Sequence, residues 1–389
     1  MRHHVPLLSI AAAALVAAAL PASAQTDTAV VARLGARADS TLLAAVPRGF
    51  NGIVRLERNG AIVLYKAYGL ANRELALPFT TATVVPLGTS TKNLTLVALL
   101  RLQAQGKLRL SDTLPKFFPD APADKRRVTL QHLVNHTAGL PTRIGGDYDE
   151  ISRDEFIRQV LATPIKWTPG ATVNYSNAGY AVLAAVIEQV TGKPYDEQVR
   201  DDILAPLGLA NTGLLLPNFD PARLAHGYLN GVDQGTMLTR PHAADGAGWN
   251  MRGSAGTLST VDDMHAFYTA LFTTTLLNAT SKKKHFDPNA AAKYVGSDQA
   301  TSFLYERAPK GTVEIIIASN AKDAATASTW SGTDALAIRS RLSEVIELLI
   351  RVGAEAVATD VASKAKASPK KSSSSRRKHR FRIRRHHHF

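Results

Sequence analysis

Apolar and polar residues alternate in short runs near both ends of the chain, which is the pattern of β-strands with one buried face. Residues 52–58 and 61–65 are two such short strand-like runs, the second apolar throughout, on either side of Asn59-Gly60, a pair typical of tight hairpin turns. Residues 300–305 and 312–318 predict two further strands. We therefore expect one antiparallel sheet that both ends of the chain complete.

Three longer stretches show the spacing of apolar residues that is typical of helices, at residues 28–45, 93–103 and 333–351. The middle stretch is mostly apolar and is followed by Gly106, a residue that commonly ends a helix. Residues 107–250 predict mostly helices and loops. Together these patterns predict an α+β fold: an antiparallel sheet of five or more strands, flanked by N- and C-terminal helices, with an inserted, mainly helical lobe.

The first 24 residues have the pattern of a secretory signal peptide. A short polar start, Arg2-His3-His4, precedes an apolar run at residues 5–20, and Ala22-Ser23-Ala24 is a small-residue cleavage site. The apolar run is too short to favour a retained membrane anchor, and no later segment is long and apolar enough to span a bilayer. We expect residues 1–24 to be removed and the protein to be exported to the periplasm or the medium of a bacterium.

The formal net charge of +14 is concentrated at the C-terminal end. Residues 361–389 hold 11 lysines and arginines and no acidic residue, and Arg2 leaves with the signal, so residues 25–360 carry only +2. The predicted folded domain, residues 25–353, therefore lacks the basic footprint of a nucleic-acid-binding protein. The absence of cysteine excludes disulfides, thiol catalysis and cysteine metal ligands.

Residues 354–389 have a different composition from the rest of the chain. Small polar and basic residues lead into a serine run at residues 372–375 and a basic block that ends in His386-His387-His388. This composition cannot build a core and predicts a disordered tail. One interpretation is adhesion to anionic lipid or polysaccharide phosphates of the cell envelope. A solvated tail without such a role is favoured.

The segment Gly88-Thr89-Ser90-Thr91-Lys92, directly before the apolar helix, carries the candidate chemistry. An alcohol is a poor nucleophile until a base takes its proton, and residues three apart share one face of a helix. Thr89 and Lys92 can therefore act as alcohol and base, whereas Ser90 points elsewhere. Burial beside a helix start is expected to make Lys92 partly neutral. The alternative is that Thr89 only caps the helix.

Two further segments bring polar groups. Residues 167–180 contain Tyr175-Ser176-Asn177 after a Pro-Gly pair, and Tyr294-Val295-Gly296-Ser297 leads into the third expected strand. With Gly88–Lys92, these segments resemble the motifs of the serine β-lactamase and penicillin-binding protein superfamily. The three corresponding motifs of that family are Gly-Ser-x-x-Lys, Tyr-Ser-Asn-x-Gly-Tyr, and Lys-Thr-Gly or His-x-Gly. The likeness covers roughly residues 49–320.

The resemblance implies roles for the first two motifs. Thr89, in place of the family's serine, would attack an acyl group. Lys92 and Tyr175 would move protons, and Asn177 would orient the lysine and the substrate. Tyr175, as a phenol between cationic neighbours, is expected to have a lowered pKa and to act as base or acid.

In the third motif, Tyr294 stands in place of the family's lysine or histidine. Gly296 would let a substrate lie against the strand backbone. The resemblance implies an oxyanion hole formed by the N–H groups of Thr89 and Ser297. Tyr294 is uncharged at neutral pH, so a substrate with a free carboxylate lacks the positively charged partner that the family's lysine or histidine would supply. This favours neutral esters or amides over β-lactams and D-Ala-D-Ala peptides.

The sequence therefore predicts an exported hydrolase that cleaves an ester or amide through a covalent acyl-enzyme, acting on a small-molecule or peptidoglycan-like acyl substrate. No cofactor and no nucleic-acid partner is implied. Threonine's extra methyl crowds the attacking hydroxyl, so activity is expected to be low. The alternative is an inactive binding module for a cell-wall peptide or acyl ligand. The oligomeric state is not predicted.

His132 and His136 lie four residues apart and could place two imidazoles on one helix face. The segment has no adjacent glutamate and no obvious third ligand, so a zinc site is a weak interpretation. We predict structural roles for both histidines and no metal site.

Overall fold

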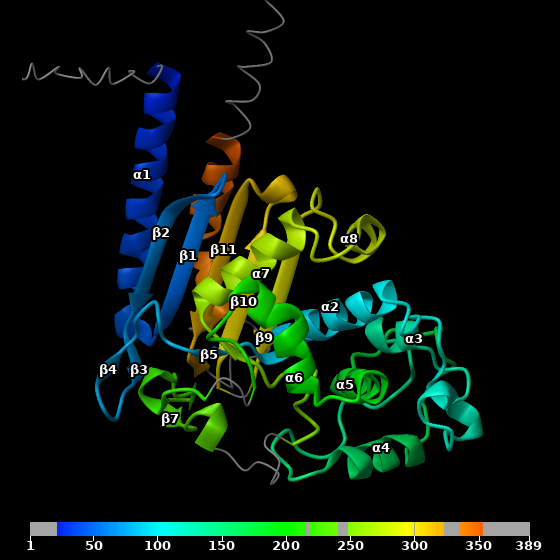
Figure 1. Ribbon diagram of the computed structural model, residues 1–389. Coiled ribbons are helices and arrows are strands. Elements are labelled where there is room, and N and C mark those ends of the chain that lie inside the picture. The colour runs from blue at the N-terminus through cyan, green and yellow to red at the C-terminus, as the bar shows by residue number, and fades with distance from the viewer. Residues whose placement is uncertain (1–21, 215–217, 240–247, 299, 323–333, 353–389) are drawn as a thin grey trace, which may run out of the picture. The chain divides into compact units, whose positions relative to one another are not determined.

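The computed structural model describes residues 22–214, 218–239, 248–298, 300–322 and 334–352 (Figure 1). The predicted tail and all but the last three residues of the predicted signal peptide lie outside these residues. None of the helices in the described ranges combines the length and apolar character needed to cross a membrane.

A five-stranded antiparallel sheet forms the centre of the fold, with strand order β2-β1-β11-β10-β9 (Figure 1). The strands are β1 Gly52–Arg58, β2 Ala61–Tyr68, β9 Ala292–Ser297, β10 Ser302–Arg307 and β11 Val313–Ser319. The hairpin turn has positive φ at Asn59 (50°) and Gly60 (77°), as tight hairpins require. The predicted sheet, completed by both ends of the chain, is confirmed.

Helices cover both faces of this sheet because its strands alternate between two apolar sets. Val54 and Leu56 of β1 face the terminal helices α1 (Ala22–Leu43) and α9 (Ala335–Arg341). Ile53 belongs to the larger core, which α7 (Val261–Thr273) helps to build on the other face (Figure 1). The C-terminal helix, expected to be continuous, breaks at Leu342 before helical residues 343–352.

The helical lobe lies between β2 and β9 in the chain, as the sequence predicts. Its central helix, α5, is buried along residues 178–187 and packs against its neighbours. The helices of this part are α2 Thr91–Ala104, α3 Leu130–Val134, α4 Arg153–Ala162, α5 Asn177–Thr191, α6 Tyr195–Val199 and α8 Ala279–His285. The short strands are β3 Leu70–Asn72, β4 Leu77–Pro78, β5 Val85–Pro86, β6 Tyr228–Leu229, β7 Val232–Asp233, β8 Leu258–Ser259 and β12 Ala321–Lys322.

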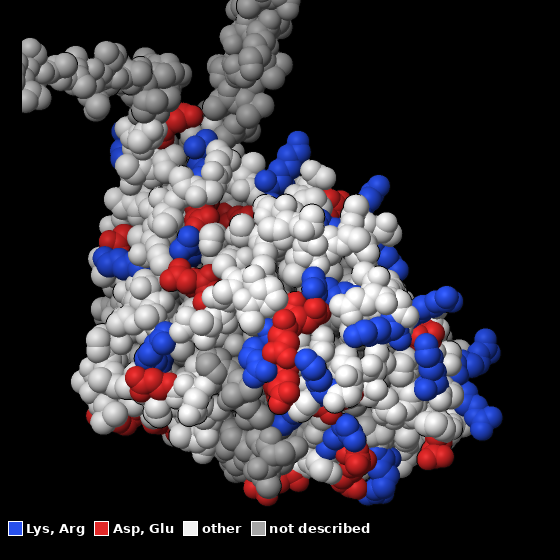
Figure 2. Space-filling model, viewed as in Figure 1, with Lys and Arg blue, Asp and Glu red and all other residues white. Residues whose placement is uncertain are grey.

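Acidic and basic side chains lie side by side over much of the face shown in Figure 2. This mixture agrees with the small net charge of residues 25–360. This face therefore offers local ion pairs more than a field of one sign.

Strand β9 touches the 3₁₀ turn Gly88–Ser90, and two glycines permit this contact. A Cβ atom on Gly296 would lie 1.9 Å from the carbonyl oxygen of Leu87, and a Cβ on Gly88 would lie 2.5 Å from the backbone nitrogen of Ser297. Gly88 also has a φ of 50°, which favours glycine. The close approach brings the start of α2 against the sheet.

We expect Gly296→Ala to separate this turn from β9. The new methyl would meet backbone, which cannot rotate away, so the variant should lose about 3 kcal/mol of unfolding free energy, at the upper end for overpacking. Gly179→Ala is the matched control, because its Cβ would have no heavy atom nearer than 3.5 Å and α5 favours alanine. Urea unfolding of both variants checks this, and a Gly296→Ala midpoint equal to wild type would contradict it.

Candidate active site

Three distant segments meet at the start of α2. The turn Gly88–Ser90 and the first residues of α2 supply Thr89 and Lys92. The loop before α5 supplies Tyr175, and α5 begins with Asn177. Strand β9 closes the site through the backbone of Val295. The convergence expected from the sequence is therefore present in the fold.

Lys92 lies at the centre of this site and is 7% exposed. Its Nζ donates hydrogen bonds to Asn177 Oδ1 and to the carbonyl oxygen of Ser254, both at 2.7 Å. Burial lowers the pKa of Lys92 to about 7, and the negative charge of Asp147 opposes this shift only in part. A large fraction of Lys92 is therefore neutral at pH 7 and able to accept a proton.

Thr89 does not point its hydroxyl at this amine. Its Oγ1 donates to the carbonyl oxygen of Val295 at 3.1 Å, and its side chain also contacts the Tyr175 phenol. Within the described residues, the hydrogen bonds of Lys92 go to Asn177 and Ser254 and none goes to Thr89. The expected pairing of Thr89 with Lys92 therefore needs a rotation of the threonine side chain.

The alternative of a simple helix cap is not supported. The N-cap position of α2 is Ser90, and no side chain makes the capping hydrogen bond there. Ser90 is 3% exposed, and its Oγ would lie 2.8 Å from a Cβ on Gly296. A hydroxyl packed under β9 is not accessible to an acyl substrate, so Thr89 remains the candidate nucleophile.

The pKa expected for Tyr175 is wrong in sign. Burial of the phenol raises its pKa to about 12, and the contact with Thr89 offsets this only in part, although 43% of the residue is exposed. Lys92 Nζ lies 5.0 Å from the centre of the ring, but that amine has itself a lowered pKa, and Asp147 adds a negative charge. Tyr175 is therefore protonated at neutral pH and suited to donate a proton.

The two histidines take structural positions. His136 Nδ1 accepts a hydrogen bond from the backbone N–H of Ser176, and its ring lies 4.6 Å from that of Tyr175. Burial and the charge of Lys92 lower the pKa of His136 to about 4, so the ring is neutral. His132 closes a capping box with Thr129 at the start of α3. Both support the loops around the site.

Tyr294 belongs to an aromatic stack. Its ring centre lies 5.5 Å from Tyr268 and 6.0 Å from Tyr305, both stacked, and 6.3 Å from the edge-on ring of Phe286. Burial raises the pKa of Tyr294 to about 12, so the ring carries no charge. An aromatic side chain thus occupies the position at which the related motif has a cation. Contact between Tyr294 and a substrate stays a prediction.

Gly296 and Ser297 lie against the turn that carries Thr89. The open side of Gly296 faces the Leu87 carbonyl, so the glycine serves close packing of protein backbone, which differs from the substrate contact expected for it. The backbone nitrogen of Ser297 lies close to Gly88, the residue that precedes Thr89 in the chain. Both N–H groups of the expected oxyanion hole therefore belong to backbones in direct contact; their role stays a prediction.

Sequence reasoning missed the groups that act through backbone or through space. The carbonyls of Ser254 and Val295 accept the hydrogen bonds of Lys92 and Thr89. Ser254 lies within residues 49–320, over which the family likeness extends, but none of the three motifs contains it. Asp147 influences Lys92 through its charge, and no motif marks it.

Comparison with known proteins assigns the chain to a family. A protein-family model described as "Beta-lactamase" matches residues 48–313. The chain is 30% identical over 246 residues to a putative penicillin-binding protein, PbpX, of Bacillus subtilis, covering 63% of this chain and 61% of that protein. It is 31% identical over 222 residues to the esterase EstB of Burkholderia gladioli, covering 51% and 56%. The chain thus spans less than two thirds of these curated relatives.

Solved structures show the same fold. The penicillin-binding protein from Bacillus halodurans superposes with a TM-score of 0.64 at 22% identity, covering 77% of this chain and 97% of that one. A D-amino acid amidase from Ochrobactrum anthropi gives 0.66 at 21% identity, covering 81% and 99%.

We predict that Lys92 makes stability depend on pH. Its pKa is about 7 in the folded state against 10.5 for the free side chain, so between these values the unfolded chain binds more protons and the free energy of unfolding rises with pH. From pH 7 to 9 this contribution is about 2 kcal/mol. Lys92→Met should lack it, whereas Lys116→Met, at a half-exposed lysine, should keep it. Urea unfolding at both pH values decides, and equal pH slopes in wild type and Lys92→Met would refute the shift.

Proposed function

Because the chain belongs to the beta-lactamase family, we propose that it is an acyl hydrolase that cleaves an ester or amide through a covalent intermediate on Thr89. The observation that carries this proposal is the buried, partly neutral Lys92, held by Asn177 and Ser254. A protein that only binds a ligand has no need of an amine tuned to accept a proton near pH 7. Relatives described as an esterase and a putative D-alanyl-D-alanine carboxypeptidase support the reaction class.

The proposed reaction begins when the Thr89 side chain rotates away from Val295. Lys92 takes the hydroxyl proton, directly or through the Tyr175 phenol, while Oγ1 attacks the acyl carbon. The N–H groups of Thr89 and Ser297 hold the oxygen that becomes negative. When the intermediate collapses, the leaving alcohol or amine takes the proton. Water then attacks the acyl group, and the same residues return Thr89 to its starting state.

The substrate we propose is a neutral ester or amide. The partly exposed Tyr294 offers an apolar ring and a hydroxyl where the related motif has a positive charge, and its stacking partners Tyr268 and Tyr305 are fully buried. A carboxylate placed there would have no cationic partner from this position. The names of similar proteins include both an esterase and an amidase, so they do not distinguish an alcohol from an amine as the leaving group.

One observation favours the alternative, a binding module without turnover. In the resting structure the Thr89 hydroxyl donates its hydrogen bond to the Val295 carbonyl. The threonine methyl restricts the χ1 rotation that attack requires. An acyl or cell-wall ligand could then occupy the site without forming a bond. Covalent labelling separates the two functions.

We expect a fluorophosphonate to form an adduct on Thr89, detected by mass spectrometry of the labelled peptide. Thr89→Val should give no adduct, and Thr89→Ser should label faster, by up to about 100-fold, since it removes the methyl that misplaces the hydroxyl. The labelling rate should rise with pH through about 7, because the base form of Lys92 accepts the proton. Ser90→Ala is the control and should label like wild type.

An adduct on Ser90 would overturn the assignment of the nucleophile. Retained ligand binding by calorimetry, with neither adduct nor product in wild type, would favour the binding module. A strong gain of hydrolysis in Thr89→Ser alone would show that threonine itself limits turnover.

We also propose that the protein is exported, on the pattern of its first 24 residues. Expression of the full chain in a bacterium should yield a protein outside the cytoplasm whose mass corresponds to a start near Gln25. Ala24→Leu should retain the leader, because a large residue blocks a small-residue cleavage site. Full-length protein that stays in the cytoplasm would refute the export proposal.

A further inference from the structure

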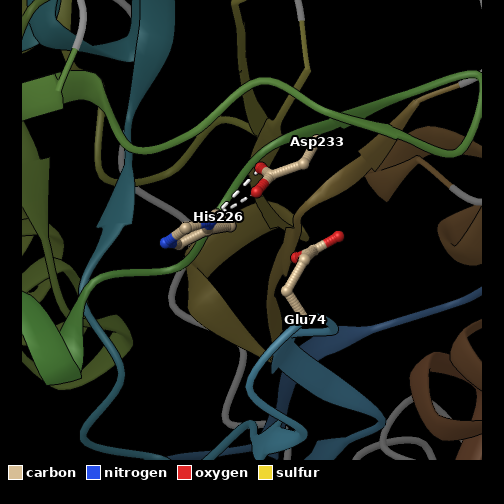
Figure 3. Close-up of side chains that lie close together, drawn as sticks. All are labelled: Glu74, His226 and Asp233. Atoms are coloured by element: carbon tan, nitrogen blue, oxygen red, sulfur yellow. Dashed lines mark hydrogen bonds and ion pairs between the residues drawn. The ribbon is translucent and has the colours of Figure 1, made fainter.

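A histidine and two carboxylates converge at a place that the proposed reaction does not use. Glu74 lies in the turn between β3 and β4, His226 lies two residues before β6, and Asp233 ends β7. One ligating atom from each lies within 4.8 Å of the other two. Figure 3 shows the Glu74 side chain from one segment close to those of His226 and Asp233 from another.

Neighbouring groups orient each of the three side chains. The Tyr228 hydroxyl donates to Glu74 Oε2 at 2.6 Å, and the backbone N–H of Gly235 donates to Asp233 Oδ1 at 2.7 Å. Asp233 Oδ2 lies 2.9 Å from His226 Nδ1. The arrangement is therefore held from outside, as supporting hydrogen bonds hold metal ligands in place.

The hydrogen bonds around His226 define its tautomer. The Leu75 N–H donates to Asn72 Oδ1 at 2.9 Å, so the Asn72 amide presents its NH₂ group to His226 Nε2 at 3.0 Å. Nε2 accepts, and the ring proton lies on Nδ1 and faces Asp233.

His226 Nδ1 is the basic atom that faces the carboxyl groups of the cluster. In the part of the chain that the structure describes, no lysine or arginine forms an ion pair with Glu74 or Asp233. The guanidinium of Arg73 lies over the Tyr228 ring, 4.1 Å from its centre. Two like charges this close favour either a proton or a bound cation between them.

We propose that Glu74, His226 and Asp233 bind one divalent transition-metal cation, with Zn²⁺ as the preferred ion. One imidazole nitrogen with two carboxylate oxygens suits Zn²⁺ better than Ca²⁺ or Mg²⁺, which take oxygen alone. In a tetrahedral site, ligand atoms about 2.1 Å from one ion lie about 3.4 Å apart, so the most distant pair of the cluster must approach by up to about 1.4 Å. Glu74 is exposed, so its side chain can make this movement.

Binding requires a defined change at the histidine. The ring proton leaves Nδ1, whose lone pair then binds the ion, and a proton is taken up at Nε2. The Asn72 amide turns so that its oxygen accepts from Nε2–H, which removes its bond to the Leu75 N–H. Water fills the remaining coordination positions.

The ion would join parts of the chain that are far apart in sequence. Glu74 belongs to the β3–β4 turn, and the other two ligands belong to the β6–β7 hairpin, which pairs with β12. Because none of the three belongs to the proposed catalytic set, the ion acts on stability and leaves the hydrolytic chemistry unchanged.

The test uses the full chain with His386→Ala, His387→Ala and His388→Ala, because the tail histidines could themselves bind Zn²⁺. After treatment with EDTA and its removal, calorimetric titration with ZnCl₂ should show one saturable site, and Zn²⁺ should raise the melting temperature. His226→Gln and Asp233→Asn should each weaken binding by 100-fold or more. His265→Gln is the matched control, since His265 pairs with the single carboxylate of Glu57, and it should bind like the parent.

Two supporting variants probe the geometry. Tyr228→Phe removes the hydroxyl that orients Glu74 and should weaken binding about 10-fold. Asn72→Asp supplies a carboxylate to accept from Nε2–H and should tighten it. The absence of a one-equivalent site in the parent chain, or unchanged Zn²⁺ affinity in both His226→Gln and Asp233→Asn, would overturn the proposal. The parent-chain titration needs no variant at the cluster to fold.

Discussion

The burial of the Lys92 amine is the constraint on which the rest of the site depends. A buried amine is stable only where its remaining protons find acceptors, and here one acceptor comes from the first turn of α5 and the other from the Ser254 carbonyl. These two hydrogen bonds fix α2 against two segments that are distant in sequence. The same burial that lowers the Lys92 pKa also raises that of Tyr175, so one desolvated volume produces both a base and an acid.

This arrangement requires that backbones approach closely. Gly88 and Gly296 let the turn before α2 touch β9, and this contact brings the Val295 carbonyl within reach of the Thr89 hydroxyl. The packing of sheet and turn therefore determines the resting position of the candidate nucleophile. A side chain at either glycine would move the hydroxyl and the neighbouring N–H groups together.

The sequence predicts the fold well because its signals are local and periodic. The Asn59-Gly60 turn and the short apolar runs of β1 and β11 follow from residue type, and the motif residues Lys92 and Asn177 do come together. What could not be predicted depends on tertiary geometry. The acceptors in Ser254 and Val295 are carbonyl groups that every residue carries, and the sign of the Tyr175 pKa shift depends on how deeply the phenol is desolvated.

The balance between hydrolase and binding module can be judged from energies. The hydrogen bond that holds the Thr89 hydroxyl on Val295 contributes only about 1 kcal/mol, so breaking it before attack slows the reaction by a factor of roughly 5 to 10. Keeping Lys92 with a pKa of about 7 in place of 10.5 costs on the order of 5 kcal/mol of stability at low pH. A protein that only binds a ligand gains nothing from that larger cost, because a neutral side chain of the same size would fill the space. The buried Lys92 amine therefore favours a role in proton transfer at this site. Thr89 in place of serine implies only that the transfer is slow.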